Sequence, residues 1–395
     1  DHNIPFVALE LRFRGGTSLD VAGQRGAINL MVGLLEEGTG DLDARGFATA
    51  RDELAASFNY SAYDDAISVS ARFLTETQDA AMALLKGSLV APSFTDVALN
   101  RVRAQVLAGL KSDSKDPDSI VSQRFDALAF GDHPYGSRAE GTIDSVSALT
   151  QDQIRAAHLG TLVRDRVYAS AVGDITAEQL TTLLDSLLSD LPQSGRPMPS
   201  KVAYELDGGT TVVDFDTPQS VAIFAQRGIE RDHPDFFAAY LVNQILGGGS
   251  FESRLMEEVR EKRGLTYGVS SYLLPKDFSH LYIGRVASAN DRIAEAVAVI
   301  RAEWTRMADR GVTQDELRRA KTYLTGSYPL RFDGNGPIAN IMVGMQMQGL
   351  PVAYINNRND KINAVTLQDA NRVAWELLDP AGLHFVVVGR PEGLE

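Results

Sequence analysis

The residues whose spacing most directly reveals metal or nucleophile chemistry are histidine and cysteine, and this chain has few of them. It has no cysteine and six histidines, no two of which are three or four residues apart: His2, His133, His158, His233, His280 and His384. A helix face therefore presents no histidine pair to a metal ion. His133 and His233 stand in Asp-His-Pro sequences, where we expect them to stabilise turns. Gly-x-Ser-x-Gly and Gly-Lys-Ser/Thr motifs are absent as well.

A glycine-rich loop is the next candidate for chemistry. Gly247, Gly248 and Gly249 precede the stretch 251–262, which reads as a helix. Backbone amides at a helix start attract anions, so a phosphate-binding loop is one interpretation. The lysine and the preceding strand that such a loop needs are missing from the pattern. We therefore interpret the glycines as a flexible loop, or as one that lets two domains approach closely.

Residues 253–267 have the pattern of a helix that ends in a sharp reversal. Gly264 can adopt the left-handed conformation that closes a helix, and a strand is expected at 267–273. Arg260 would lie on the helix before this reversal, which we call the corner, and Tyr267 on the strand after it. Taken alone, a surface cation and an aromatic residue at a strand start explain this pair equally well.

The elements that position these residues follow from the periodicity of apolar side chains. Alternation with β-branched and aromatic residues predicts strands at 6–13, 67–73, 167–172, 210–215, 220–226, 280–287 and 385–388. Apolar spacing of three and four residues predicts helices at 76–90, 95–110, 176–188, 292–307 and 313–323. Strand pairs followed by helix pairs indicate an α+β fold class with antiparallel or mixed sheets, each covered by helices on one face.

The chain also repeats itself. The strand end Val172-Gly173-Asp174 is echoed by Val388-Gly389-Arg390, and the helical segment 94–109 is echoed by 312–326. This period is far too long for a solenoid, so we predict two homologous halves, 1–191 and 201–395. Between them, 192–200 contains three prolines, which favour an extended, semi-rigid linker.

The length and the net charge of the chain limit the functions that it can have. A chain of 395 residues is long enough for two or three domains. A net charge of −14 argues against nucleic acid or an anionic membrane as the main partner. No apolar run approaches the ~20 residues of a membrane span. The first residue is Asp1 rather than Met, so we expect a processed or shortened product.

Several segments resemble one family along essentially the whole chain. They are Phe13-Arg14-Gly15-Gly16-Thr17, Glu37-Gly38-Thr39, His133-Pro134-Tyr135-Gly136, Val172-Gly173-Asp174, and the glycine-rich loop that leads to Arg260 and Tyr267. They resemble the pitrilysin/insulinase-type zinc metallopeptidases, which include the mitochondrial processing peptidases and bacterial relatives. In that family an arginine and a tyrosine at this spacing reach into an active site formed by a first half.

The zinc motif of the family is degenerate in this sequence. Its His-x-x-Glu-His motif precedes the Gly-Thr step, which places Asn29, Val32 and Gly33 where the first histidine, the glutamate base and the second histidine belong. The third ligand, a glutamate, falls at Gly109. Zinc hydrolases need three protein ligands, a water and a carboxylate base. The resemblance therefore implies no metal or other cofactor in this chain, and no peptide hydrolysis by this chain alone.

Some bacterial and mitochondrial members of the family divide the work between two chains, and the sequence resembles their zinc-free subunit. The implied partner is a homologous zinc-bearing subunit, and the implied substrate is a peptide enclosed by the heterodimer. In that role Tyr267 would donate a hydrogen bond to the oxyanion, and Arg260 would hold a peptide carbonyl or backbone. The segment 56–63 matches the substrate-binding strand of zinc-bearing members and is expected to be structural here.

Two alternatives remain open, namely a structural scaffold subunit and a peptide-binding or chaperone-like homodimer without catalysis. Retention of both Arg260 and Tyr267 argues against the scaffold. For localisation we expect the periplasm, with the cytoplasm as the alternative, because a chain without cysteine tolerates both compartments.

Overall fold

The computed structural model describes residues 4–249 and 252–394, which form two compact units. The first unit combines the described part of Asp1–Lys111 with Ser137–Pro199 and Leu330–Val352. The second combines Ser112–Gly136, Ser200–Pro329 and the described part of Ala353–Glu395. The first unit therefore includes one segment that follows residues 192–200, and the second includes one segment that precedes them. Residues 192–200 themselves form no helix or strand.

The first unit is built on a four-stranded antiparallel sheet in the order β4-β5-β1-β6, and β2 pairs with β3 in a separate two-stranded sheet. The strands of the unit are β1 (Phe6–Arg14), β2 (Gly38–Thr39), β3 (Leu42–Asp43), β4 (Ser57–Ala62), β5 (Ala66–Leu74) and β6 (Val167–Gly173). Its helices are α1 (Ala27–Gly33), α2 (Ala44–Glu53), α3 (Gln78–Val90), most of α4 (Asp96–Asp113), α6 (Ile143–Ala148), α7 (Gln151–Thr161), α8 (Ala177–Leu188) and α12 (Asn335–Met347). Alternate residues of β1 such as Leu9 and Leu11 are fully buried in a core shared with α1, α3 and α8.

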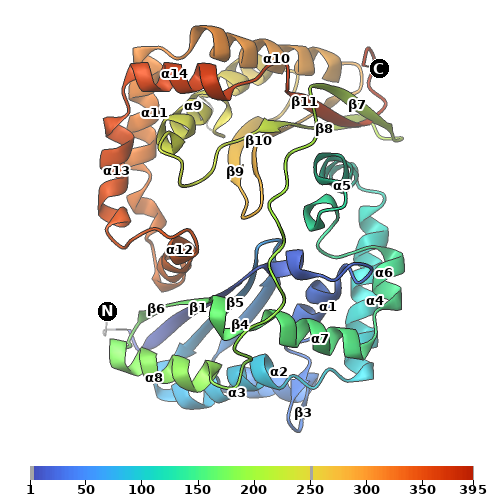
Figure 1. Cartoon of the computed structure of the whole chain (residues 1–395), viewed down its shortest axis with the longest axis vertical. Helices are drawn as coiled ribbons and strands as arrows, with labels where there is room; N and C mark the ends of the chain where they lie inside the picture. Colours follow the sequence, from blue (N-terminus) through green and yellow to red (C-terminus); the bar gives the residue numbers. More distant parts are fainter. Residues whose placement is uncertain (1–3, 250–251, 395) are drawn as a thin grey trace. The chain divides into compact units, whose positions relative to one another are not determined.

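The opposite face of this sheet is polar and is covered by α12 (Figure 1). Arg12 donates to Asn340 Oδ1 at 2.6 Å, and Gln346 donates to the carbonyl of Ala169 at 2.8 Å. Glu10 is buried on this strand, and burial raises the pKa of its carboxyl group. The expectation of helices on one face is therefore wrong. It failed because the outward residues of β1 are charged and indicated a solvated face.

The second unit contains a five-stranded mixed sheet in the order β7-β11-β8-β10-β9, with β11 parallel to β7. Its strands are β7 (Gly209–Asp214), β8 (Gln219–Arg227), β9 (Val269–Pro275), β10 (His280–Ala289) and β11 (His384–Gly389). Its helices are α5 (Pro117–Phe130), α9 (Phe236–Gly247), α10 (Ile293–Arg310), α11 (Gln314–Gly326), α13 (Tyr354–Ala364), α14 (Leu367–Leu377) and the π-helix Met256–Glu261. Helices α9, α10 and α14 share one core with the sheet.

Helix α5 covers the other face of that sheet (Figure 1). Phe125 and Phe130 are buried in a separate core with Val221 and Ile223 of β8. This sheet, too, has helices on both faces, in contrast to the expectation of one.

The α+β class and the mixed sheets are confirmed, and the seven strands predicted from the alternation of apolar residues all coincide with observed strands. Four neighbouring strands also have an equivalent order in both sheets, since β4-β5-β1-β6 corresponds to β9-β10-β8-β11. This correspondence supports two homologous halves and a linker between them, which stay predictions. Within the described ranges, no helix has the length and hydropathy to cross a membrane.

Candidate functional site

The positions of the degenerate zinc motif lie on α1 and α4. Val32 is buried in the apolar core, and a Cβ added to Gly33 would lie 3.0 Å from a methyl group of Val102 on α4. Asn29 is half-buried on the same helix, whereas open space surrounds Gly109 in the described structure. The residue that faces Gly33 on α4 is therefore Val102, which was not among the positions predicted from the zinc motif.

These residues do not fit a zinc ion. Valine and glycine side chains offer no lone pair, and packing between α1 and α4 is apolar. In the described part of the chain, no group of three or more histidine, aspartate or glutamate side chains is placed to hold a metal.

We expect zinc to leave the stability of the isolated chain unchanged. A metal that binds only the folded state would add about 2.7 kcal/mol at a hundredfold excess over its Kd. Thermal unfolding in excess zinc and in EDTA measures this directly, with Asn29→Ala as a matched variant. A Tm that rises with zinc concentration in the wild type and not in Asn29→Ala would contradict the expectation.

The segment before the corner forms a π-helix rather than the α-helix expected at 251–262. The amide of Lys262 donates to the carbonyl of Glu257 at 2.9 Å, five residues earlier. Leu255 and Val259 are fully buried in the core of the second unit, which fixes one side of this turn. Single turns of π-helix occur frequently at functional sites. Residue 251 of the predicted helix lies outside the described residues.

Ion pairs between neighbouring residues stabilise the π-helix. Glu258 is buried and receives hydrogen bonds from Lys262 and Arg263, each at 2.7 Å. These hydrogen bonds lower the pKa of the Glu258 carboxyl group. A charged Glu258 therefore links the middle of the π-helix to its end.

A second ion pair ties the start of this segment to α11. Arg254 contacts both carboxylate oxygens of Glu316, at 2.7 and 2.9 Å, and donates to the carbonyl of Gly311 at 2.9 Å. Burial by itself raises the pKa of Glu316. Hydrogen bonds from Arg254 and Thr313 more than offset this effect and lower the pKa to about 2.

The corner itself closes at Gly264, which has the left-handed φ of +60° that the sequence predicted. Its amide donates to the carbonyl of Arg260 at 2.7 Å. Arg292 donates to the carbonyls of Arg263 and Gly264, both at 2.9 Å.

Tyr267 follows this closed turn and projects into solvent, with 90% of its surface exposed. It lies in a bend two residues before β9, so the prediction that it begins the strand is wrong. The hydroxyl of Thr266 accepts a hydrogen bond from the amide of Gly268 at 3.1 Å, and pairing with β10 begins only at Val269. Arg260 is one-third exposed, with Nε 3.6 Å from Glu261 Oε1. The structure thus places Arg260 and Tyr267 on the two sides of one closed turn.

The glycine-rich loop serves close packing. A Cβ added to Gly247, the last residue of α9, would lie 2.4 Å from the hydroxyl of Ser271 on β9. A Cβ added to Gly248 would lie 2.6 Å from the Cα of Gln244, and Gly249 has a φ of +79°. The close approach at Gly247 joins α9 to β9 within the second unit. The predicted close approach of two domains and the flexibility of the loop stay predictions.

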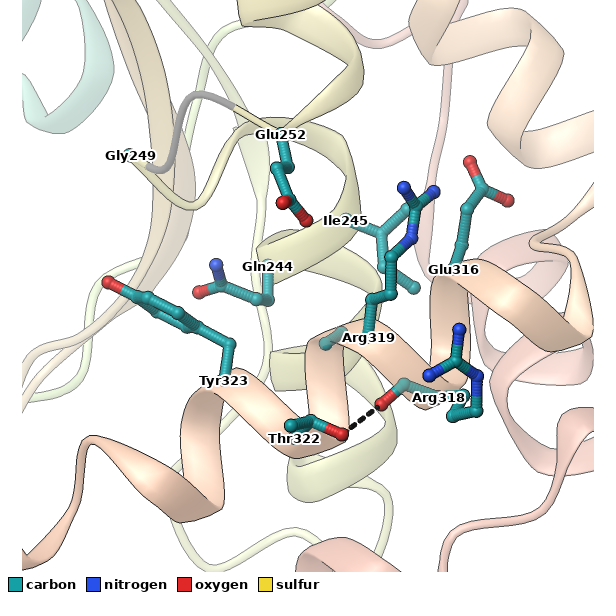
Figure 2. A pocket seen from close by; sticks show the side chains of 10 residues that line it. Gln244, Ile245, Gly249, Glu252, Glu316, Arg318, Arg319, Thr322 and Tyr323 are labelled. Atoms are coloured by element: carbon teal, nitrogen blue, oxygen red, sulfur yellow. Dashed lines mark hydrogen bonds between the residues drawn. The ribbon is translucent and has the colours of Figure 1, made fainter.

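A pocket of about 700 Å³ lies between α9 and α11. Its lining residues are Gln244, Ile245, Gly249, Glu252, Glu316, Arg318, Arg319, Ala320, Thr322 and Tyr323. Figure 2 shows Gln244 and Tyr323 on one side of this pocket and Arg319 on the other. The mixture of apolar, amide, aromatic and charged groups suits a peptide segment better than a simple ion.

The histidines have structural roles where they are described. His133 and His233 each accept a hydrogen bond at 3.1 Å from the amide two residues later, which confirms the turn prediction. His158 is buried with Nε2 2.7 Å from the carbonyl of Leu89, and His384 lies between Asp207 and Thr211. His2 lies outside the described residues.

Comparison with known proteins gives a consistent result. Residues 148–324 match the family model of the peptidase M16 inactive domain. The chain is 28% identical to a non-peptidase homolog, YmxG, of Helicobacter pylori, over 98% of this chain and 90% of that protein. It is 25% identical to an uncharacterized zinc protease of Rickettsia bellii, over 82% of this chain and 78% of that protein.

The same family appears among solved structures. The crystal structure of a peptidase M16 inactive domain from Pseudomonas fluorescens matches with a TM-score of 0.92 and 28% identity. The match covers 100% of this chain and 96% of that one. Agreement of sequence, motifs and fold along the whole length leads to one assignment. The chain belongs to the M16 family of peptidases, the pitrilysin type.

Proposed function

We propose that this chain is the zinc-free subunit of a heterodimeric M16 metallopeptidase. It contributes Arg260 and Tyr267 to an active site whose zinc is held by a homologous partner. The observation that carries the proposal is the closed turn that follows Arg260 and exposes Tyr267. Valine and glycine at the metal positions, and the non-peptidase status of the H. pylori homolog, support a zinc-free role.

The proposed chemistry follows from the two side chains. Attack of water on a peptide carbonyl creates a negative oxygen, and a phenol hydroxyl placed about 3 Å away stabilises it by a hydrogen bond. The guanidinium of Arg260 provides a planar set of donors for a neighbouring peptide carbonyl. Both groups act on substrate bound in the partner's site, so neither needs a metal in this chain.

The proposed substrate is an extended or unfolded peptide, and the proposed compartment is the periplasm. The net charge of −14 would favour basic peptides, because opposite charge raises the rate of encounter.

A second candidate is peptide binding without catalysis, which the pocket between α9 and α11 favours. Its apolar residues Ile245 and Ala320 lie beside charges of both signs. In this case the chain would bind peptides whether or not a zinc-bearing partner is present.

The proposed function is tested by peptide hydrolysis in three samples: this chain with zinc, a homologous zinc-bearing chain alone, and the two together. We expect activity only in the mixture. Arg260→Ala should lower kcat/KM about 10- to 100-fold, because it removes a charge-assisted hydrogen bond to substrate.

Arg310→Ala, at the exposed end of α10, is the control and should leave activity unchanged. Zinc-dependent hydrolysis by this chain alone would refute the zinc-free assignment. A mixture that is indifferent to Arg260→Ala would favour the second candidate, and saturable peptide binding by this chain alone would then identify it.

A further inference from the structure

The backbone that leads to Tyr267 is held by side chains from one short segment at the end of β10 and the start of α10. Arg292 donates to the carbonyls of Arg263 and Gly264, each at 2.9 Å. Ser288, which is buried, donates to the carbonyl of Leu265. Three consecutive carbonyl oxygens after the π-helix are therefore bound by two side chains.

At the next residue, Thr266, the turn is the donor and β10 provides the acceptor. Thr266 donates its hydroxyl to the carbonyl of Ala287 at 2.6 Å and accepts the amide of Gly268 at 3.1 Å. Thr266 is thus fixed to β10, and the amide of Gly268 is bound to Thr266 in turn. The Tyr267 side chain itself is almost fully exposed and makes no hydrogen bond with any residue of the described chain.

Arg292 binds carbonyl oxygens just after the end of a helix. Carbonyl oxygens at the end of a helix carry partial negative charge and are normally satisfied by water or by a glycine cap. Here a glycine cap is present at Gly264, and Arg292 is bound in addition. A guanidinium at this end is electrostatically favourable and, because it is planar and bidentate, also fixes the orientation of two peptide groups.

We propose that Arg292, supported by Ser288, is a positioning residue that fixes the backbone from which the Tyr267 side chain projects. The inference rests on the proposed function, since it assigns the device that prepares Tyr267 for the partner's site. An oxyanion donor acts at full strength only when its position is set before the reaction. Arg292 contacts the backbone of the turn and acts on substrate only through Tyr267.

The activity test is a double-mutant cycle in the reconstituted heterodimer. We expect Arg292→Ala to lower kcat about 10- to 100-fold with little change in KM, because small displacements of a catalytic group have effects of this size. Arg292→Lys keeps the charge but loses the planar fork, so it should recover only part of the activity. In a Tyr267→Phe background, Arg292→Ala should change kcat less than about twofold, because interacting residues are non-additive.

A second measurement uses the chain alone. Hydrogen exchange at the hydrogen-bonded amides of Gly264, Leu265 and Gly268 should become at least about tenfold faster in Arg292→Ala, while α10 and β10 exchange as in the wild type. Arg310→Ala, on the far end of α10, should change neither exchange nor activity.

The outcomes separate this inference from the proposed function. If Tyr267→Phe lowers kcat and Arg292→Ala lowers it independently, by the same factor in both backgrounds, the positioning role is overturned. Unchanged hydrogen exchange at the amides of Gly264, Leu265 and Gly268 overturns it as well. If Tyr267→Phe itself has no effect, the proposed function fails, and Arg292 then has no catalytic group to position.

Discussion

Replacement of Tyr267 by phenylalanine is expected to lower the kcat of the reconstituted peptidase about 10²- to 10³-fold. The variant removes one hydroxyl and leaves the ring, and loss of a single oxyanion donor typically has an effect of this size. The KM should change little, because the hydrogen bond strengthens only as charge develops on the substrate oxygen. The folded chain should be as stable as the wild type, since the hydroxyl of this exposed residue makes no hydrogen bond in the described structure.

Steady-state hydrolysis of one peptide by the mixed subunits, with and without Tyr267→Phe, measures the effect. The matched control is Tyr272→Phe, because Tyr272 lies on β9 five residues later and is also partly exposed. It should retain wild-type activity. Equal losses in both variants would point to a general disturbance of β9, and no loss in Tyr267→Phe would remove this residue from the active site.

The largest expected effect on stability comes from Arg254→Met. The Arg254 and Glu316 side chains are only 10% and 18% exposed, and loss of one partner leaves the other charge buried. Such a loss typically costs about 3–5 kcal/mol in free energy of unfolding. Urea unfolding of wild type and variant measures the difference.

Arg318→Ala is the comparison, because Arg318 pairs with Asp315 on the same helix and its side chain is 66% exposed. That surface pair should contribute less than about 1 kcal/mol. Comparable losses in the two variants would contradict the importance assigned to burial of the Arg254–Glu316 pair.

The same pair gives a signed pH dependence. In the folded chain the pKa of Glu316 is about 2, below its ordinary value of 4.5. The stabilisation is therefore fully present above about pH 4.5 and declines as the pH falls toward 2. The difference in unfolding free energy between wild type and Glu316→Gln should shrink over this range. A difference that is constant from pH 7 to pH 3 would show that ionisation of Glu316 is not its source.

The sequence predicted the strands well because the apolar side chains of each sheet alternate. Leu9 and Leu11 of β1 are examples, with both residues buried in the same core. The corner was predictable for a similar local reason, since Gly264 is among the few residues that close a helix in the left-handed conformation. Local patterns of this kind are legible without tertiary information.

The remaining features depend on partners distant in the sequence. Nothing near Glu10 or Arg12 indicates that α12, more than 300 residues later, would cover them. The position of Tyr267 outside β9 was not predictable because the residues just before it are bound by Ala287, Ser288 and Arg292, which are more than 20 residues away. Val102 was not predicted because its position opposite Gly33 depends on the packing of α1 against α4, which the spacing of residues along the chain does not reveal.

The placement of α12 and α5 has a consequence for synthesis on the ribosome. The first unit has nearly all of its strands and helices by Pro199, but the helix that covers the polar face of its sheet is not complete until Met347. Helix α5, in turn, is made about 90 residues before β8, the strand whose valine and isoleucine it covers. The nascent chain must therefore keep Phe125 and Phe130 from aggregating while their partners are still untranslated, which is a demand that chaperones commonly meet.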